Sequence, residues 1–264
     1  RLSDDALCCS VEFYPVYARV SPEDKIRIVQ AWQDRGAVVA MTGDGFNDAP
    51  ARKAADVGLA MGKNGTDVAK GASDMVLTDD NFATIVEAVN EGRYVYDNIK
   101  KTIYFLLVCN LSEIVIMLFA QIAGLGVLLT PIMLLLINLL GDGIPGLQLA
   151  REVSDENLMA RKPITRDESF FSGGLLRKIM RQTLACSAVS LLAFFIGTNI
   201  ALPGGTMSVA VGQTRAFLTV GWTSMLHIFH VRSEKSVFKT SVRNNKALAG
   251  SAILMILVFA LLVC

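Results

Sequence analysis

Residues 41 to 50, Met-Thr-Gly-Asp-Gly-Phe-Asn-Asp-Ala-Pro, concentrate side chains that suit phosphate and metal chemistry. Glycines on both sides of Asp44 let the backbone turn sharply and bring this carboxylate next to a phosphate or a metal. Asp48 is placed to cap a helix that Pro50 leads. The loop is therefore predicted to hold Mg²⁺ and a phosphoryl group. A tight turn before a capped helix is the alternative for Gly-Asp-Gly alone.

A second set of polar residues lies within apolar segments further along the chain. Asn110 and Glu113 are three residues apart, and Asn138 and Asp142 are four apart, so each pair falls on one face of a helix. A carboxylate inside a membrane span is costly and predicts a functional site. Two carboxylates and two amide oxygens suit a hard cation such as Ca²⁺. Polar contact between helices is the alternative, but it accounts poorly for the two carboxylates together.

The loop at 41–50 follows a short apolar run, Gly36–Met41, which predicts a buried strand of a parallel sheet. Sites of open α/β sheets lie at the carboxyl ends of such strands. Residues 56–61 and 74–78 predict two further strands, and 66–72 predict a helix between them. This β-α-β order is typical of an α/β domain with a parallel sheet.

Upstream of these strands, Ser21 is expected to cap a helix with Pro22 at its first position. Lys25 lies in the first turn of that helix, where a cation is unfavourable unless an anion is nearby. A solvated surface lysine is the alternative. Residues 11–17 alternate enough to predict a strand.

Composition divides the chain into a charged amino-terminal part and a membrane region. Hydrophobic residues make up 52% of the chain, too many for an ordinary soluble domain. The second apolar span is expected to break at Gly141–Gly146, which would free carbonyl oxygens at membrane depth. Five transmembrane spans are predicted, at 93–125, 131–150, 184–202, 216–231 and 247–264.

The distribution of charge predicts how the chain is oriented in the membrane, and the net charge argues against nucleic acid as a partner. Lys and Arg gather before the first span, across 151–181 and across 232–246, whereas the loops 126–130 and 203–214 have none. This distribution places the amino-terminal part in the cytoplasm. A net charge of +1 without a basic stripe argues against nucleic acid, so the lipid bilayer is the expected surrounding.

Two groups receive no assigned role. His227 and His230 share a face of the fourth span and suggest metal ligands or proton carriers. No cysteine or carboxylate accompanies them within the span, so a helix end or a polar interface is favoured. The five cysteines show neither metal-ligand spacing nor a paired framework.

The loop also resembles a known motif. Thr-Gly-Asp-Gly-Phe-Asn-Asp-Ala-Pro at 42–50 closely resembles the hinge motif of the P-type ATPases, which usually has Val where this chain has Phe46. The resemblance implies that Asp44, assisted by Asp48, binds the catalytic Mg²⁺. It also implies that Asn47 and Asp48 support a phosphorylated aspartate.

A second motif is similar to the same family. Residues 18–25 match its Ala-Arg-Val-x-Pro-x-x-Lys pattern, which implies that Lys25 contacts the phosphoryl group and that Arg19 lies towards the ATP nucleotide. The family's phosphorylation domain is a haloacid-dehalogenase-like parallel sheet. Residues 1–92 are therefore expected to be the carboxyl-terminal half of that domain, and 93–264 a stalk followed by an all-α bundle of about five transmembrane helices.

The first two spans resemble the calcium-pump branch, of the sarcoplasmic-reticulum type, whose Asn-x-x-Glu and Asn-x-x-Thr-Asp-Gly motifs bind the transported ions. The matching residues here are Asn110, Glu113, Asn138 and Asp142. Gly141 replaces the threonine, and the asparagine at 138, where sodium-potassium pumps have aspartate, favours calcium. Ser224 falls near the position of a glutamate in two-site pumps, so one ion site is expected.

These resemblances identify the chain as the carboxyl-terminal part of a P-type cation pump that exports Ca²⁺ across the plasma membrane. The family's phosphorylated aspartate lies in Asp-Lys-Thr-Gly-Thr, which does not occur in this chain. The chain is thus expected to depend on the amino-terminal part of the same pump and to be inactive alone. The alternatives are a pump for Na⁺, K⁺ or Mg²⁺, and a catalytically silent, membrane-anchored dehalogenase-like fragment.

Overall fold

The computed structural model describes residues 2–43, 45–152, 157–164, 168–200, 207–232 and 245–263. Asp44, the predicted Mg²⁺ ligand, lies outside the described residues. The chain divides into two compact units. The first comprises Arg1–Gly92 and Met159–Ser169, and the second comprises Arg93–Leu158 and Phe170–Cys264.

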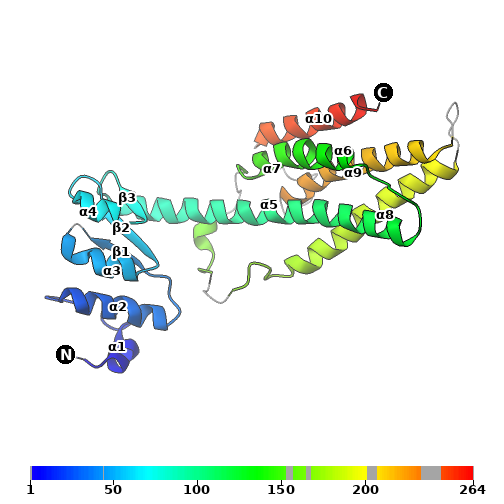
Figure 1. Ribbon diagram of the computed structural model, residues 1–264. Coiled ribbons are helices and arrows are strands. Elements are labelled where there is room, and N and C mark those ends of the chain that lie inside the picture. Colours follow the sequence, from blue (N-terminus) through cyan, green and yellow to red (C-terminus); the bar gives the residue numbers. More distant parts are fainter. Residues whose placement is uncertain are drawn as a thin grey trace. The chain divides into compact units, whose positions relative to one another are not determined.

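The first unit contains a parallel sheet of three strands in the order β1-β2-β3 (Figure 1). The strands are β1 (Ala40–Gly43), β2 (Val57–Met61) and β3 (Met75–Leu77). Between them lie a 3₁₀ turn, η1 (Phe46–Asp48), and the helices α3 (Ala49–Ala54) and α4 (Asp67–Gly71). The predicted β-α-β order and parallel sheet are confirmed.

β1 differs from its prediction in position and burial. It begins at Ala40 rather than Gly36, and Ala40 itself is exposed. β1 pairs only with β2 in the described sheet, so it is an edge strand. By contrast, Leu59 and Ala60 of the central strand β2 are buried.

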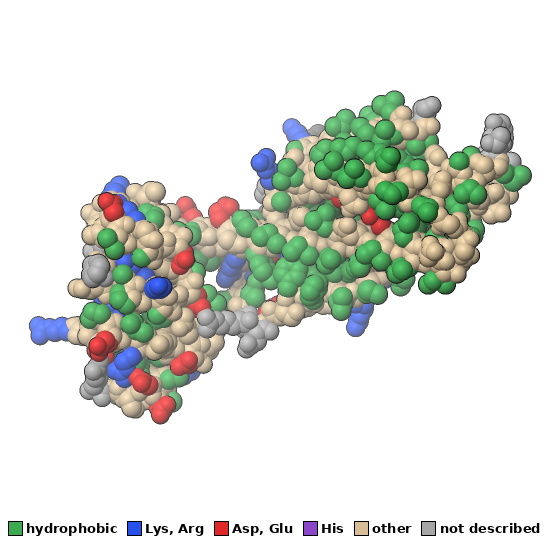
Figure 2. Space-filling view, in the orientation of Figure 1, with side chains coloured by type: hydrophobic (Ala, Val, Ile, Leu, Met, Phe, Trp, Pro, Cys, Tyr) green, Lys and Arg blue, Asp and Glu red, His purple; other side chains and the backbone are tan. Residues whose placement is uncertain are grey.

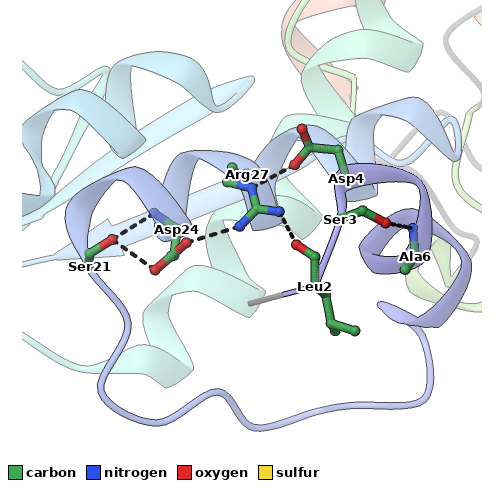
Figure 3. A network of polar contacts seen from close by, with 7 residues as sticks. All are labelled: Leu2, Ser3, Asp4, Ala6, Ser21, Asp24 and Arg27. Carbon is green, nitrogen blue, oxygen red and sulfur yellow. Dashed lines mark hydrogen bonds and ion pairs between the residues drawn. The ribbon is translucent and has the colours of Figure 1, made fainter.

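The helix α2 (Pro22–Asp34) begins as predicted. The backbone N–H of Asp24 donates to Ser21 Oγ at 3.2 Å, and Pro22 occupies the first helical position. One turn later, Arg27 donates to the Asp24 carboxylate at 3.1 Å and to the Asp4 carboxylate at 2.6 Å (Figure 3). Arg27 therefore ties α2 to the neighbouring helix α1 (Asp4–Ser10).

The strand predicted at 11–17 is wrong, because these residues form turns and irregular chain. Val11 is 1% exposed and packs with Leu7 of α1 and Ala31 of α2. Phe13 and Val16 remain exposed. Alternating apolar residues form a strand only beside a partner strand, and here the first of them joins a helical core instead.

The second unit is helical. α5 (Phe82–Ile122) has 41 residues, and the part from Arg93 onward belongs to this unit. At 1.5 Å per residue this helix is roughly 60 Å long. The other helices are α6 (Pro131–Leu136), the π-helix η2 (Ile137–Asp142), α7 (Gly143–Leu149), α8 (Leu175–Asn199), α9 (Val209–Arg232) and α10 (Lys246–Leu261). The 3₁₀ turn η3 (Leu158–Ala160) lies where the chain passes from the second unit to the first.

Three helices in the described part of the chain are long and apolar enough to cross a membrane. They are Phe82–Ile122, Pro131–Leu149 and Leu175–Asn199. Figure 2 shows hydrophobic side chains over much of the visible face of the second unit, as expected for a membrane region. α10 is apolar but short, and α9 carries Gln213, Arg215 and two histidines, so the count of five spans remains a prediction.

The predicted helix break at Gly141–Gly146 is wrong. The chain stays helical through this stretch. Its irregularity is the π-helix η2, which begins at Ile137 and includes Gly141, and there the Gly143 N–H donates to the Asn138 carbonyl five residues before it. Pro145 lacks the N–H that would bond the carbonyl four residues earlier, and the wider π turn accommodates this loss without ending the helix.

Candidate functional site

The second unit brings together three of the four predicted cation ligands. Glu113 of α5 is 6% exposed, and Asp142, at the end of η2, is 1% exposed. Asn138 Nδ2 donates to Glu113 Oε2 at 2.8 Å and to the Leu134 carbonyl at 3.0 Å. Asn138 and Asp142 occupy one turn of η2, so the carboxylates approach each other from two helices.

The carboxylate oxygens at this cluster are largely unsatisfied. Glu113 Oε1 and both carboxylate oxygens of Asp142 are buried without a hydrogen-bond partner among the described residues. The Cys109 thiol and the Ser224 hydroxyl lie beside Asp142 and are at most weak, neutral donors to it, so neither supplies a charge. Buried carboxylates need a compensating partner, because desolvation of an unpaired charge is strongly unfavourable. The cluster is thus an oxygen-rich site at which no described lysine or arginine forms an ion pair.

Asn110 is not part of this cluster. Its side chain is exposed, and its Nδ2 donates at 2.7 Å to the Leu106 carbonyl of its own helix. Residues three apart are separated by about 60° around an α-helix, which is enough to turn Asn110 away from the buried face that holds Glu113. The ligand role of Asn110 remains a prediction.

His227 of α9 packs among aromatic rings rather than beside carboxylates. It is 2% exposed, meets the Tyr104 ring edge-on at 5.2 Å and stacks on Phe105 at 6.0 Å. It also lines a small cavity with Cys109. His230 is exposed. Within the described ranges no group of three or more His, Cys, Asp or Glu side chains is present, so a histidine metal site gains no support.

In the first unit, Lys25 and Asp48 form an ion pair. Asp48 is therefore the nearby anion that makes a cation favourable in the first turn of α2. Asp48 occupies the position before α3, but its side chain makes no capping hydrogen bond, so the predicted cap is wrong. Its carboxylate turns to Lys25 instead, because an ionic partner is stronger than a neutral backbone donor.

Gly43 and Arg52 hold the backbone on both sides of position 44. A Cβ at Gly43 would lie 2.5 Å from the Asp48 Cβ, so only glycine fits there. Arg52 is 1% exposed, and its guanidinium donates to the carbonyls of Gly43 at 2.7 Å and Gly45 at 3.5 Å. Sequence reasoning missed Arg52, since an arginine in a helix is usually solvated. Its place one turn after Asp48 was the available signal.

Asn47 and Arg19 are both exposed. Arg19 has a φ of +54°, a left-handed conformation that is uncommon for any residue except glycine. Their predicted contacts with the phosphorylated aspartate and with the nucleotide remain predictions.

A second buried network in the helical unit was also missed. Arg232 Nε donates to Glu152 Oε1, and Asn245 Nδ2 donates to Glu152 Oε2 at 2.8 Å. Asn98 Nδ2 donates to the Glu152 backbone carbonyl at 2.7 Å. Glu152 thus joins α5, the end of α9 and the start of α10, and both of its carboxylate oxygens have partners.

Comparison with known proteins shows which family the chain resembles. Residues 126–264 match the family described as "Cation transporting ATPase, C-terminus". A calcium-transporting ATPase of Bacillus subtilis (strain 168) is 44% identical over 261 residues, which cover 98% of this chain and 29% of that protein. A calcium-transporting ATPase of Listeria monocytogenes is 41% identical over 263 residues, covering 99% of this chain and 29% of that protein. A P-type sodium-transporting ATPase of Toxoplasma gondii is 54% identical over 153 residues, covering 58% of this chain and 11% of that protein.

The chain spans 29% of the length of both calcium-transporting relatives. The family match covers more than half of the chain and includes Asn138 and Asp142. The chain therefore belongs to the cation-transporting P-type ATPases and corresponds to their carboxyl-terminal part.

Proposed function

We propose that this chain is the ion-binding, carboxyl-terminal part of an ATP-driven pump that exports one Ca²⁺ per cycle across the plasma membrane, with the first unit in the cytoplasm. The observation that carries the proposal is the set of three buried carboxylate oxygens on Glu113 and Asp142 without a hydrogen-bond partner. A divalent cation supplies the missing positive charge, and oxygen-only ligands match the preference of Ca²⁺. The names of the bacterial relatives support the same ion.

The transported Ca²⁺ would be held by Glu113, Asn138 and Asp142. Asn138 would exchange its hydrogen bond with Glu113 for a contact through its amide oxygen. Asn110 would join the site only if its side chain left the Leu106 carbonyl. Ser224 is buried beside Asp142 and offers a neutral hydroxyl, which supports a single ion site.

In the first unit, Asp44 and Asp48 would hold Mg²⁺, and ATP would phosphorylate an aspartate contributed by another part of the pump. The oxygen donors suit this hard cation, and Asp48 Oδ2 faces the backbone of Gly43. When bound, Mg²⁺ would stabilise the charge of the phosphoryl group. Lys25 would add positive charge there while it orients Asp48.

The remaining residues of the first unit would position the nucleotide and the loop. Asn47 would support the phosphorylated aspartate, and Arg19 would face the nucleotide. Arg52 fixes the carbonyls on both sides of Asp44 and would keep the loop in shape. The three parallel strands suit part of a haloacid-dehalogenase-like sheet, and α9 and α10 would complete five spans.

The test uses the complete pump in membrane vesicles. Glu113→Gln and Asp142→Asn should each raise the Ca²⁺ concentration for half-maximal ATP hydrolysis at least about a hundredfold, because a lost charged ligand costs more than the 10–100-fold of an outer partner. Phosphorylation from inorganic phosphate should persist in both variants. Gln121→Ala, an exposed polar residue of the same helix, is the matched control. Wild-type Ca²⁺ activation in both acidic variants would refute the site.

A sodium pump is the second candidate, because the Toxoplasma relative carries that name and has the higher identity over its shorter match. A monovalent ion needs less negative charge than Ca²⁺, and the two carboxylates favour the divalent ion. ATP hydrolysis stimulated by Na⁺ and indifferent to Ca²⁺ would establish this alternative.

A further inference from the structure

Phe259 of α10 is fully buried and lies against glycines of two other helical segments. A Cβ built on Gly141 would lie 3.0 Å from Phe259 Cζ, and a Cβ on Gly221 would lie 2.9 Å from Cδ2 and Cε2. The Phe217 ring meets the Phe259 ring edge-on at 5.3 Å and closes another side. The ring thus fills the space that side chains at 141 and 221 would need.

The contact with Gly141 falls on the backbone of the ion site. Gly141 directly precedes Asp142 in η2, so a sideways movement of Gly141 moves the Cα of Asp142 with it. A π turn is a rare, single-turn widening of an α-helix, so packing against neighbouring helices helps to hold its shape. At Gly141 the closest neighbour from another helix is the Phe259 ring.

We propose that Phe259 is a positioning residue for cation binding: its ring holds η2 in the conformation that presents Asp142 opposite Glu113. This inference rests on the proposed function of the cluster. Phe259 does not touch the ion and acts through the backbone of Gly141. Its replacement should therefore change ion affinity more than its contribution to the core alone would explain.

Phe194 of α8 provides a matched control. It is 3% exposed, belongs to the same hydrophobic cluster, and its ring also abuts a glycine, with Cδ2 3.1 Å from a Cβ built on Gly212. Gly212 lies on α9 and not on η2. Phe194→Leu and Phe259→Leu remove similar volumes from similar surroundings, and only the second removes support from Asp142.

The first experiment compares these two variants in the complete pump. Phe259→Leu should raise the Ca²⁺ concentration for half-maximal ATP hydrolysis about tenfold, while Phe194→Leu should change it less than about twofold at a comparable loss of thermal stability. Equal shifts in the two variants, or none in either, would overturn the inference. Wild-type Ca²⁺ activation in Asp142→Asn would instead overturn the proposed function, so the two failures are distinguishable.

The second experiment leaves Phe259 in place and adds a methyl group from the other side. Gly141→Ala should weaken Ca²⁺ activation about tenfold, because the new Cβ collides with the ring. In the Phe259→Leu background the same substitution should cause no further loss, since the smaller side chain leaves room. Additive losses would contradict the inference. If Phe259→Leu is not produced, Phe259→Met provides the same background.

Discussion

Asp48 and Asp142 are both buried aspartates, one in each unit, and they differ in what neutralises them. Asp48 is 8% exposed and has Lys25 as its ionic partner. Asp142 is 1% exposed, and within the described chain only the neutral Cys109 thiol and Ser224 hydroxyl lie beside its oxygens. The charge of Asp48 is balanced within the protein, so its loss should cost some stability in addition to weakening the proposed Mg²⁺ site. The charge of Asp142 depends on something from outside, so its loss should chiefly affect binding.

Glu152 shows that the helical unit does provide partners to a structural carboxylate. It is 5% exposed, and Arg232 and Asn245 satisfy both of its oxygens. A buried carboxylate in this unit can therefore have hydrogen-bond partners for both oxygens. The exceptions are Glu113 and Asp142, which is why we assign binding to them.

The largest expected effect on stability is at Glu152. Glu152→Ala leaves Arg232 buried without its carboxylate, which typically costs about 3–5 kcal/mol of unfolding free energy. Thermal unfolding of the complete pump in detergent measures this loss, and double replacement of Glu152 and Arg232 by apolar residues should recover much of it. A stability equal to wild type would mean that the pair contributes no more than a surface contact.

Asp142→Asn should leave the stability of the ion-free protein intact and remove its stabilisation by Ca²⁺. Without Ca²⁺ the variant should be at least as stable as the wild type, because an unpaired carboxylate is replaced by a neutral amide. At a Ca²⁺ concentration about 100 times Kd, the wild type gains about 2.7 kcal/mol from binding, and the variant should gain almost none. A thermal shift assay with and without Ca²⁺ measures both quantities. Destabilisation of the ion-free form would place Asp142 with Glu152 as a structural residue.

Asp48→Asn should lower the free energy of unfolding less than Glu152→Ala does. The side chain of Lys25 is 30% exposed and can turn to water, so the lost ion pair should cost about 1 kcal/mol or less. Stabilisation by Ca²⁺ should be unchanged. Amide hydrogen exchange in the first unit detects a loss of this size, and Asp67→Asn, which alters an exposed ion pair with Lys70, is the control.

What the sequence predicted correctly follows from the geometry of one helix or from the pairing of two consecutive helices. Ser21 and Asp24 are three residues apart, so their capping contact follows from helix geometry. Glu113 and Asn138 lie on consecutive apolar segments joined by a short loop, so their meeting follows from antiparallel packing. In both cases the types of the polar residues and their spacing in the sequence were enough to predict the contact.

The errors and omissions involve partners that only the folded chain brings together. Lys25 and Asp48 are 23 residues apart, and the sequence offered Asp48 a nearer partner in its own helix. Glu152 and Arg232 are 80 residues apart and carry no motif. A break was predicted at Pro145, but the chain stays helical there because a π-helix precedes it. The spacing of apolar residues does not distinguish a π-helix from a break.

The smallest predicted effect concerns Asp80, a partly exposed residue whose carboxylate accepts backbone hydrogen bonds. Its oxygens accept from the N–H groups of Lys63 at 3.0 Å and Asn64 at 2.9 Å, and these hydrogen bonds lower the pKa of Asp80 below its ordinary value of 3.8. A lowered pKa in the folded state means that the contribution to stability is present above about pH 4 and is lost as the pH falls through the lowered value. The Lys63 and Asn64 amides should therefore lose protection from hydrogen exchange only in strong acid.

Asp80→Asn tests this assignment directly. Asparagine tolerates the left-handed φ of +56° at this position and keeps one acceptor oxygen, but it does not titrate. The acid-dependent step at Lys63 and Asn64 should disappear, while overall stability at neutral pH should change little because the site is exposed. Glu87→Gln, at an exposed position of α5, should keep the step. A step that persists in Asp80→Asn would show that another carboxylate controls this loop, and the contrast with Asp142 would then rest on Asp48 and Glu152 alone.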